Sequence, residues 1–280
     1  MKITSRPSHE ESRHDLAGRL IAGRNSNGQD EFEGTRPKKP NNAGSEILEP
    51  GPPKFCAGER GIHWLVWQIA DSAFPTGGFA HSNGLESTWQ QGEIRSPEEL
   101  AELTRIYLAQ IGRSALPFVN EAYHQSQPFA DLDRLYDAFV SNHVANRGSR
   151  AQGQAFLLAS AQSFSLPSLI DFRAMVLQQK VPGHFAPIFG NVFHLLKISH
   201  AVCVRLFLFM NLRGLLASAV RLGIAGPMAA QSLQSRLEGH AEEVAQRSAT
   251  AGVADAAQIS PLLDILHGAH DRLYSRLFQT

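Results

Sequence analysis

From Ile62 onward, apolar residues recur every three or four positions, which is the spacing of an amphipathic helix and not the alternation of a half-buried strand. Residues 96–99, Ser-Pro-Glu-Glu, mark one helix start, because the serine can cap the helix, the proline suits its first turn and the acids lie at the positive end of the helix dipole. Leu100, Leu103 and Ile111 continue this helix as one apolar stripe. Comparable stripes follow, so the pattern predicts an all-α fold, a bundle of roughly eight to ten helices.

Residues 187–222 are apolar nearly all round, which places this segment at the centre of the bundle. We expect Gly190 and Gly214 to permit close helix approach there. The stretch 201–220 is long enough to span a membrane, but Arg205 and Arg213 would be costly at the bilayer centre. The prediction is therefore a core helix and no membrane association.

The last part of the chain predicts one helix that starts at Ser260. Its apolar face carries, at steps of three or four, Leu262, Leu266, Ala269, Leu273 and Leu277. Asp264, His267 and His270 form a second stripe that could offer one oxygen and two nitrogens to a metal ion. Polar residues opposite an apolar face recur in any amphipathic helix, so the pattern favours a solvated surface and leaves these three as weak metal candidates.

The first 60 residues differ from the rest because they are rich in proline and glycine and contain only two aromatic residues, Phe32 and Phe55. Such a composition cannot bury enough surface to offset chain entropy. We therefore predict a disordered leader over residues 1–60 and an all-helical domain over residues 61–280. The alternative for the leader is that it docks on a partner.

The charge balance excludes some classes of function. The 26 Lys and Arg residues equal the 26 Asp and Glu residues, so no basic excess suggests a nucleic-acid surface. Two cysteines cannot build a disulfide framework, and Cys203 in its apolar surroundings reads as a small buried hydrophobe. The first residues do not resemble a secretory or transit signal, so a cytoplasmic location is expected.

Common catalytic motifs are missing from the chain. It has no phosphate-binding loop ending in Gly-Lys-Ser or Gly-Lys-Thr, no Gly-x-Ser-x-Gly turn, no His-Glu-x-x-His and no paired Cys-x-x-Cys. These absences point to a protein that acts by binding, not to an enzyme.

The least ordinary stretch is residues 64–87, WLVWQIADSAFPTGGFAHSNGLES. Its first helix must stop near Ser72, because Pro75 lacks an amide hydrogen and the following glycines permit positive φ. A new helix can begin after Ser82. From the residues alone, a packed corner whose Phe74 and Phe79 fill the core is favoured over a recognition surface.

This stretch resembles the signature of the UreF family of urease accessory proteins. The matching residues are Asp71, Ser72, Pro75, Gly77, Gly78, Phe79, Ser82, Gly84, Leu85 and Glu86. The run Phe-Ala-His-Ser is similar to the eukaryotic form of the family. Further likeness follows in RGSRAQGQAFLLAS at 147–160, GHFAPIFG at 183–190, ASAVRLGIAGPMAAQSL at 217–233 and HDRLYSRLFQT at 270–280. The resemblance covers about residues 62–280.

The resemblance implies a non-enzymatic, all-helical scaffold that forms a homodimer. Such a scaffold binds a UreD/UreH-type accessory protein, recruits and regulates a UreG-type GTPase, and so takes part in nickel insertion into apo-urease. No tightly bound cofactor is implied, and Ni²⁺ would pass only transiently. In this family the C-terminal tail inserts into the UreD-type partner.

The candidate partner-binding residues follow from the motif and the tail. They are Phe74, Pro75, Gly77, Gly78, Phe79, His81, Ser82, Glu86, Arg221, Tyr274, Arg276, Leu277 and Phe278. The alternative for Leu277 and Phe278 is that they close onto the chain's own core. The rival functions are a small helical-bundle metal-dependent hydrolase that uses the C-terminal histidines, and a helical adaptor for unrelated partners.

Overall fold

The computed structural model describes residues 59–280, with side chains described from Trp64. Every regular element in this part is helical, which confirms the all-α fold. The described helices number slightly more than expected because α2 and α12 are short. The predicted leader lies outside the described residues except for its last two positions, since α1 begins at Glu59.

The α-helices are α1 Glu59–Ala70, α2 Leu85–Gln90, α3 Pro97–Ser114, α4 Leu116–His124, α5 Phe129–Phe139, α6 His143–Phe164, α7 Pro167–Gln178, α8 Phe185–Leu195, α9 His200–Arg221, α10 Pro227–Arg236, α11 Glu238–Ser248 and α12 Pro261–Gly268. Three short 3-10 helices join them: η1 Gly78–Ala80, η2 Val253–Asp255 and η3 Ala269–Arg272.

The predicted start of α3 is confirmed. The Ser96 hydroxyl accepts the backbone N–H of Glu99 at 3.2 Å, and the Glu99 carboxylate accepts the backbone N–H of Ser96 at 3.0 Å. This reciprocal capping box satisfies two amides that a helix end otherwise leaves without partners.

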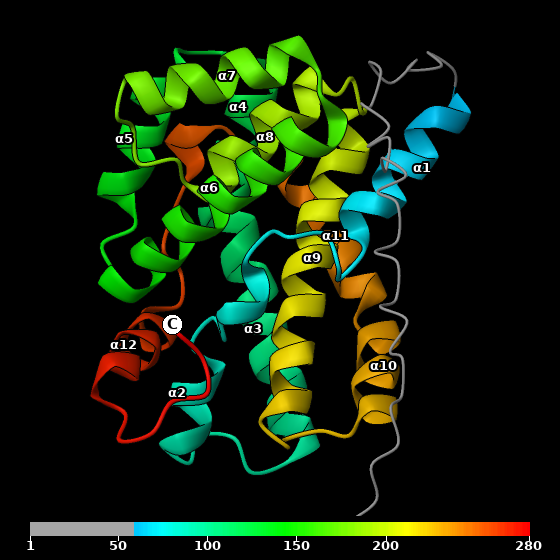
Figure 1. Cartoon of the computed structure of the whole chain (residues 1–280). Helices are drawn as coiled ribbons and strands as arrows, with labels where there is room; N and C mark the ends of the chain where they lie inside the picture. The colour runs from blue at the N-terminus through cyan, green and yellow to red at the C-terminus, as the bar shows by residue number, and fades with distance from the viewer. Residues whose placement is uncertain (1–58) are drawn as a thin grey trace, which may run out of the picture. The chain divides into compact units, whose positions relative to one another are not determined.

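The centre of the fold is formed by α8 and α9, as the apolar run predicts. Figure 1 shows α9 as a long yellow helix between α3 on one side and α10 and α11 on the other, and all three contact it. Phe189, Phe193 and Phe207 are buried, with ring centroids 4.3 Å apart for Phe189 and Phe193 and 5.1 Å for Phe189 and Phe207. By length and composition, α9 is the one helix of the described part that could cross a membrane, and about half of its apolar stretch is buried inside the fold.

One of the two predicted glycine contacts is present. A Cβ on Gly190 would lie 2.2 Å from the carbonyl oxygen of Val119, so α8 approaches α4 backbone to backbone only because residue 190 is glycine. Gly214 has open space around the same position, so the prediction of a close approach there is wrong. The α4–α8 pair is the most extensive helix contact of the described part.

The prediction of a single C-terminal helix is also wrong. Helix α12 ends at Gly268, η3 follows, and residues 273–280, hereafter the tail, run back as an extended segment beside α2 (Figure 1). The predicted apolar face of α12 is buried only in part, because Leu266 is buried and Leu262 is exposed. Leu262 and Ile265 are 62% and 69% exposed, whereas the histidine stripe faces inward. Contacts of the polar side chains with α2 and α6 therefore outweigh the local apolar spacing.

Candidate functional site

The site begins at the turn after α1. Asp71 accepts the backbone N–H of Ala73 on its carboxylate at 2.8 Å and that of Phe74 on its carbonyl at 3.1 Å. The Phe74 ring stacks on Phe164 with centroids 5.9 Å apart and is buried. Phe74 thus fills the core, as the packed-corner interpretation predicts. The same prediction is wrong for Phe79, which is exposed.

Two glycines give the corner its shape. Gly77 precedes η1 with φ 73°, and Gly84 precedes α2 with φ 84°, both in the left-handed region. A Cβ on Gly84 would also lie 2.9 Å from the Cβ of His267, so this glycine lets α12 pack on the start of α2. The predicted break near Ser72 and the new helix after Ser82 are confirmed within a few residues.

The corner holds the chain's own tail. The buried Glu86 carboxylate accepts the backbone N–H groups of Leu277 and Phe278 at 2.6 and 3.1 Å. The same carboxylate lies 3.2 Å from Nε2 of the buried His270. One acidic side chain of the motif therefore fixes both η3 and the tail, and it is buried beneath them.

The last residues of the tail continue this contact. Ser82 donates its backbone N–H to the backbone oxygen of Thr280 at 2.6 Å, and Gln279 donates to the carbonyl of Ala80 at 2.9 Å. His81 Nδ1 forms a hydrogen bond with the Thr280 hydroxyl. Burial, with Arg147 and His270 nearby, lowers the pKa of His81, which favours the neutral ring that this contact uses.

An arginine joins the corner to the tail. The Arg221 guanidinium lies 3.7 Å from the Phe79 ring centroid and 4.2 Å from that of Phe278, and it donates a hydrogen bond to the carbonyl of Phe79. Such cation–π contacts favour arginine over lysine, since the planar guanidinium stacks on rings. Phe79 itself is 74% exposed, whereas Phe278 is only 4% exposed.

The predicted partner-binding residues fall into a buried group and an exposed or half-buried group. Five are buried within the described chain and serve its own packing: Phe74, His81, Ser82, Glu86 and Phe278. Their assignment to a partner surface is corrected, because the tail and the core already occupy them. The others are exposed or half-buried: Pro75, Gly77, Gly78, Phe79, Arg221, Tyr274, Arg276 and Leu277. For Leu277 and Phe278, the alternative of closure on the core is right for Phe278 alone.

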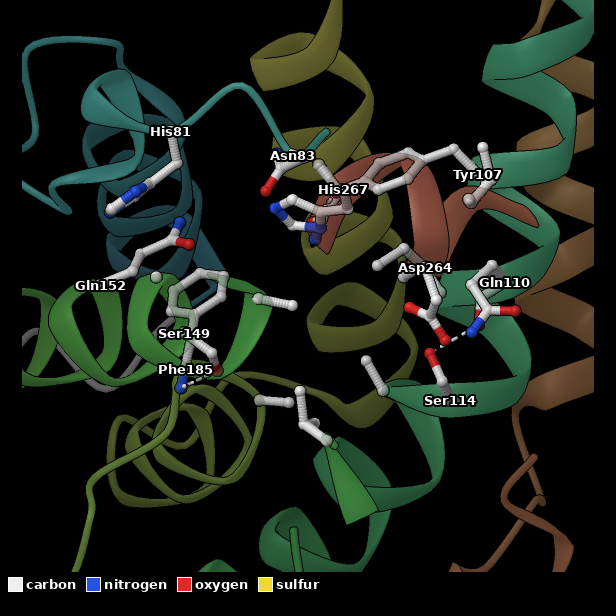
Figure 2. Close-up of a pocket in the computed structure, with 18 of the residues that line it drawn as sticks. His81, Asn83, Tyr107, Gln110, Ser114, Ser149, Gln152, Phe185, Asp264 and His267 are labelled. Carbon is white, nitrogen blue, oxygen red and sulfur yellow. Dashed lines mark hydrogen bonds between the residues drawn. The ribbon is translucent and has the colours of Figure 1, made fainter. Parts of the chain in front are cut away.

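A cavity of about 140 Å³ with both polar and apolar lining residues lies between α3, α6 and α12, and Thr280 of the tail also lines it (Figure 2). Asp264 and His267 of α12 line it together with His81, Tyr107 and Gln110. The His267 Nε2 atom is inaccessible to solvent and has no hydrogen-bond partner. Burial beside His270 and His81 lowers the pKa of His267 to about 3, and burial raises that of Asp264.

The stripe of weak metal candidates is not assembled as a metal centre. His270 is committed to Glu86, and the Asp264 backbone carbonyl accepts from Asn142 at 2.7 Å. Over residues 59–280, no group of three histidine, cysteine or carboxylate side chains is arranged to hold a metal ion. The preferred interpretation as solvated surface is also wrong, because His267 and His270 face the interior.

Sequence reasoning missed two polar contacts that support the site. Arg147 of α6 donates two hydrogen bonds to the Asp271 carboxylate, at 3.1 and 2.8 Å, and lowers the pKa of that carboxyl to about 2. Asp133 of α5 accepts the backbone N–H groups of Gly183 and His184 at 2.6 and 2.8 Å. Both pairs lie far apart in sequence, so no local spacing indicated them.

The repeated small residues of α6 have steric reasons. A Cβ on Gly148 would lie 3.0 Å from the Thr280 hydroxyl, and one on Gly153 would lie 2.2 Å from the Gly183 carbonyl. The segments 147–160 and 183–190 therefore meet backbone to backbone, and α6 supports the tail from below.

Comparison with known proteins places this architecture in a family. The UreF family model matches residues 94–238. Urease accessory protein F of Oryza sativa subsp. indica is 39% identical over 221 residues, covering 78% of this chain and 85% of that protein. The Arabidopsis thaliana protein of the same name is 38% identical, covering 78% and 92%, and urease accessory protein UreF of Bacillus sp. (strain TB-90) is 27% identical, covering 77% and 97%. The chain therefore belongs to the UreF family of urease accessory proteins.

Proposed function

We propose that this chain is a non-enzymatic scaffold of urease maturation that works as a homodimer in the cytoplasm. It binds a UreD/UreH-type accessory protein, recruits and regulates a UreG-type GTPase, and so assists nickel insertion into apo-urease. Family membership supports the general role, and the exposed surfaces of the structure support action by binding. Nickel is the cargo of this process, and no resident cofactor is required.

The observation that carries the proposal is the apolar surface that α12 exposes to solvent. Leu262 and Ile265 of this helix are exposed to solvent, and so is Ile259 just before it. We call these three residues the α12 face. Exposed apolar side chains in such a group mark a surface that a partner covers, since water contact with them is unfavourable.

The tail adds a second group of exposed side chains. Tyr274 and Leu277 face solvent although their neighbour Phe278 is anchored in the core. A tyrosine beside apolar side chains is typical of interface hot spots. We assign the α12 face and the tail surface to the UreD-type partner, and the exposed Phe79 at the corner to the GTPase.

A pull-down with three purified variants tests this assignment. Leu262→Glu with Ile265→Glu places two charges on the α12 face and is expected to abolish co-purification with the UreD-type protein. Met228→Glu is the control, because Met228 of α10 is also an exposed apolar residue and lies on another helix. Phe79→Ser should retain the UreD-type partner and weaken recruitment of the GTPase. Circular dichroism checks that each variant is folded.

Two results would contradict the assignment. Undiminished binding of the UreD-type protein by the folded double variant would exclude the α12 face as its site. Equal loss in the Met228→Glu control would show that surface charge alone prevents binding.

A further inference from the structure

A histidine cluster lies at the opposite end of α9 from Arg221, outside the site described above. His124 is the last residue of α4, His194 lies in the last turn of α8, and His200 is the first residue of α9. The rings of all three surround Tyr123, at centroid distances of 5.2, 5.9 and 5.0 Å. The His124 and His200 rings are only 4.7 Å apart.

A close contact between two helices and one hydrogen bond hold these residues in place. The glycine contact between Gly190 and Val119 sets the ends of α4 and α8 side by side. The Tyr123 hydroxyl donates to the carbonyl of Ile198 at 2.8 Å, which ties α4 to the connection between α8 and α9. The cluster is therefore held by the backbone of three helices and not by a mobile loop.

Hydrogen bonds fix the proton position on His200. The Asn120 amide nitrogen donates to the carbonyls of Ser248 and Ala251, both at 2.8 Å, so the amide oxygen of Asn120 is its free acceptor. His200 Nε2 lies 2.9 Å from that oxygen and must be the N–H donor. The lone pair of the neutral ring is then on Nδ1. Metal-binding histidines commonly have this arrangement, in which one ring nitrogen donates to an oxygen and the other binds the metal.

We propose that His124 and His200 form a binding site for one divalent transition-metal ion of the class that prefers imidazole, such as Ni²⁺ or Zn²⁺. Burial and the adjacent His124 lower the pKa of His200, which keeps its ring neutral and able to bind a metal. Two imidazoles supply the protein ligands, and water completes the coordination shell. The ring of His194 also lies against Tyr123.

The residues present support a site with two protein ligands, in which water fills the other coordination positions. No three potential ligands already converge within the part of the chain that the structure describes. The three rings that lie against the Tyr123 ring are all imidazoles, so the site offers nitrogen ligands. Nitrogen ligands favour Ni²⁺, Cu²⁺ and Zn²⁺ over Mg²⁺ and Ca²⁺.

Titration of the full-length chain with Ni²⁺ alone and with Zn²⁺ alone, against a chromophoric chelator, tests the proposal. We expect His124→Gln to weaken one binding event at least about tenfold, the lower end of the loss seen when metal sites are perturbed. His240→Gln is the control, because His240 of α11 is a half-exposed histidine on another helix, and its ring hydrogen-bonds to the Arg105 carbonyl. His200→Gln should behave like His124→Gln, with circular dichroism confirming the fold.

Proton NMR locates the ion independently of affinity. Paramagnetic Ni²⁺ should broaden the ring signals of Tyr123 at substoichiometric concentration and leave those of Tyr274 sharp. The proposal is overturned if the His124 and His200 variants both bind the metal with unchanged affinity, or if Ni²⁺ does not broaden the Tyr123 signals. Either result would mean that the histidines only pack against Tyr123. The test needs no partner protein, so its outcome is separate from the proposed scaffold role.

Discussion

Glu86 shows how much of the fold a single motif residue organises. Its buried carboxylate accepts two backbone N–H groups of the tail and contacts His270, so three donors from residues 270–278 depend on one side chain. An acid in the first turn of α2 is also favourable toward the helix dipole. The residue therefore links the corner to the tail and to η3 at once.

Replacing Glu86 with glutamine should loosen the tail. The glutamine side chain has one oxygen that can accept a hydrogen bond, but its NH₂ group would face a donor of the tail or of His270. A buried donor left without an acceptor costs about 1–3 kcal/mol. Hydrogen exchange should show faster exchange at Leu277 and Phe278, and the free energy of unfolding should fall by that amount. Glu93→Gln, at an exposed position, is the control. Unchanged exchange at both amides would mean that the carboxylate does not hold the tail.

His267 makes stability depend on pH. Its pKa is about 3 in the folded chain and about 6.5 when unfolded, so the unfolded chain binds a proton that the folded chain excludes. Stability is therefore full above pH 6.5 and falls as the pH drops from 6.5 toward 3.

The matching measurement is urea unfolding of the wild type and of His267→Leu at pH 7.5 and pH 5. The wild type should lose more stability between the two pH values than the variant, which lacks the ionisable ring. Equal losses would show that His267 is not the group responsible.

At the scale of elements, α4 and α8 depend on one glycine. Gly190→Ala places a Cβ 2.2 Å from the Val119 carbonyl, and neither backbone can move without disturbing the core. Gly214→Ala in α9 meets open space, so it should stabilise the helix by about 0.5–1 kcal/mol. Thermal melting should therefore move in opposite directions for the two variants. A Gly190→Ala variant as stable as the wild type would contradict the close helix contact.

The sequence predicts helices well where the signal is local. The cap at Ser96, the break before Pro75 and the buried run 187–222 each follow from spacing within a few residues. The orientation of α12 could not be predicted in this way, because it is set by Arg147, Glu86 and Asn142, which lie more than 100 positions away. Gly190 and Gly214 have the same local appearance, and only the tertiary structure distinguishes them.

For the candidate site, the motif was identified correctly but its role was partly misassigned. The residues of the stretch 74–86 were predicted to face a partner, yet several of them bind the chain's own tail. Sequence spacing cannot show this, because the contacting residues are almost 200 positions apart. The exposed members, Phe79 and Tyr274, remain predictions for partner contact.

At the scale of the whole molecule, the tail is part of the folded unit. Deleting residues 277–280 removes the buried Phe278 ring and leaves Glu86 and Ser82 without their tail partners. We expect the free energy of unfolding to fall by about 3 kcal/mol or more, as for other buried phenylalanines that are lost. Calorimetry checks this against Tyr274→Ala, an exposed tail residue that should melt like the wild type. A truncated chain with unchanged stability would mean that the tail is not packed in solution.

The central claim is that the chain acts by presenting helical surfaces to other maturation proteins. Its most direct test is nickel incorporation into urease in cells that contain apo-urease, a UreD-type protein and a UreG-type GTPase but no UreF protein. Expression of this chain, or of its Met228→Glu variant, should restore the nickel content and activity of urease, and the Leu262→Glu, Ile265→Glu variant should not. Equal nickel loading in cells with and without the chain would contradict the account.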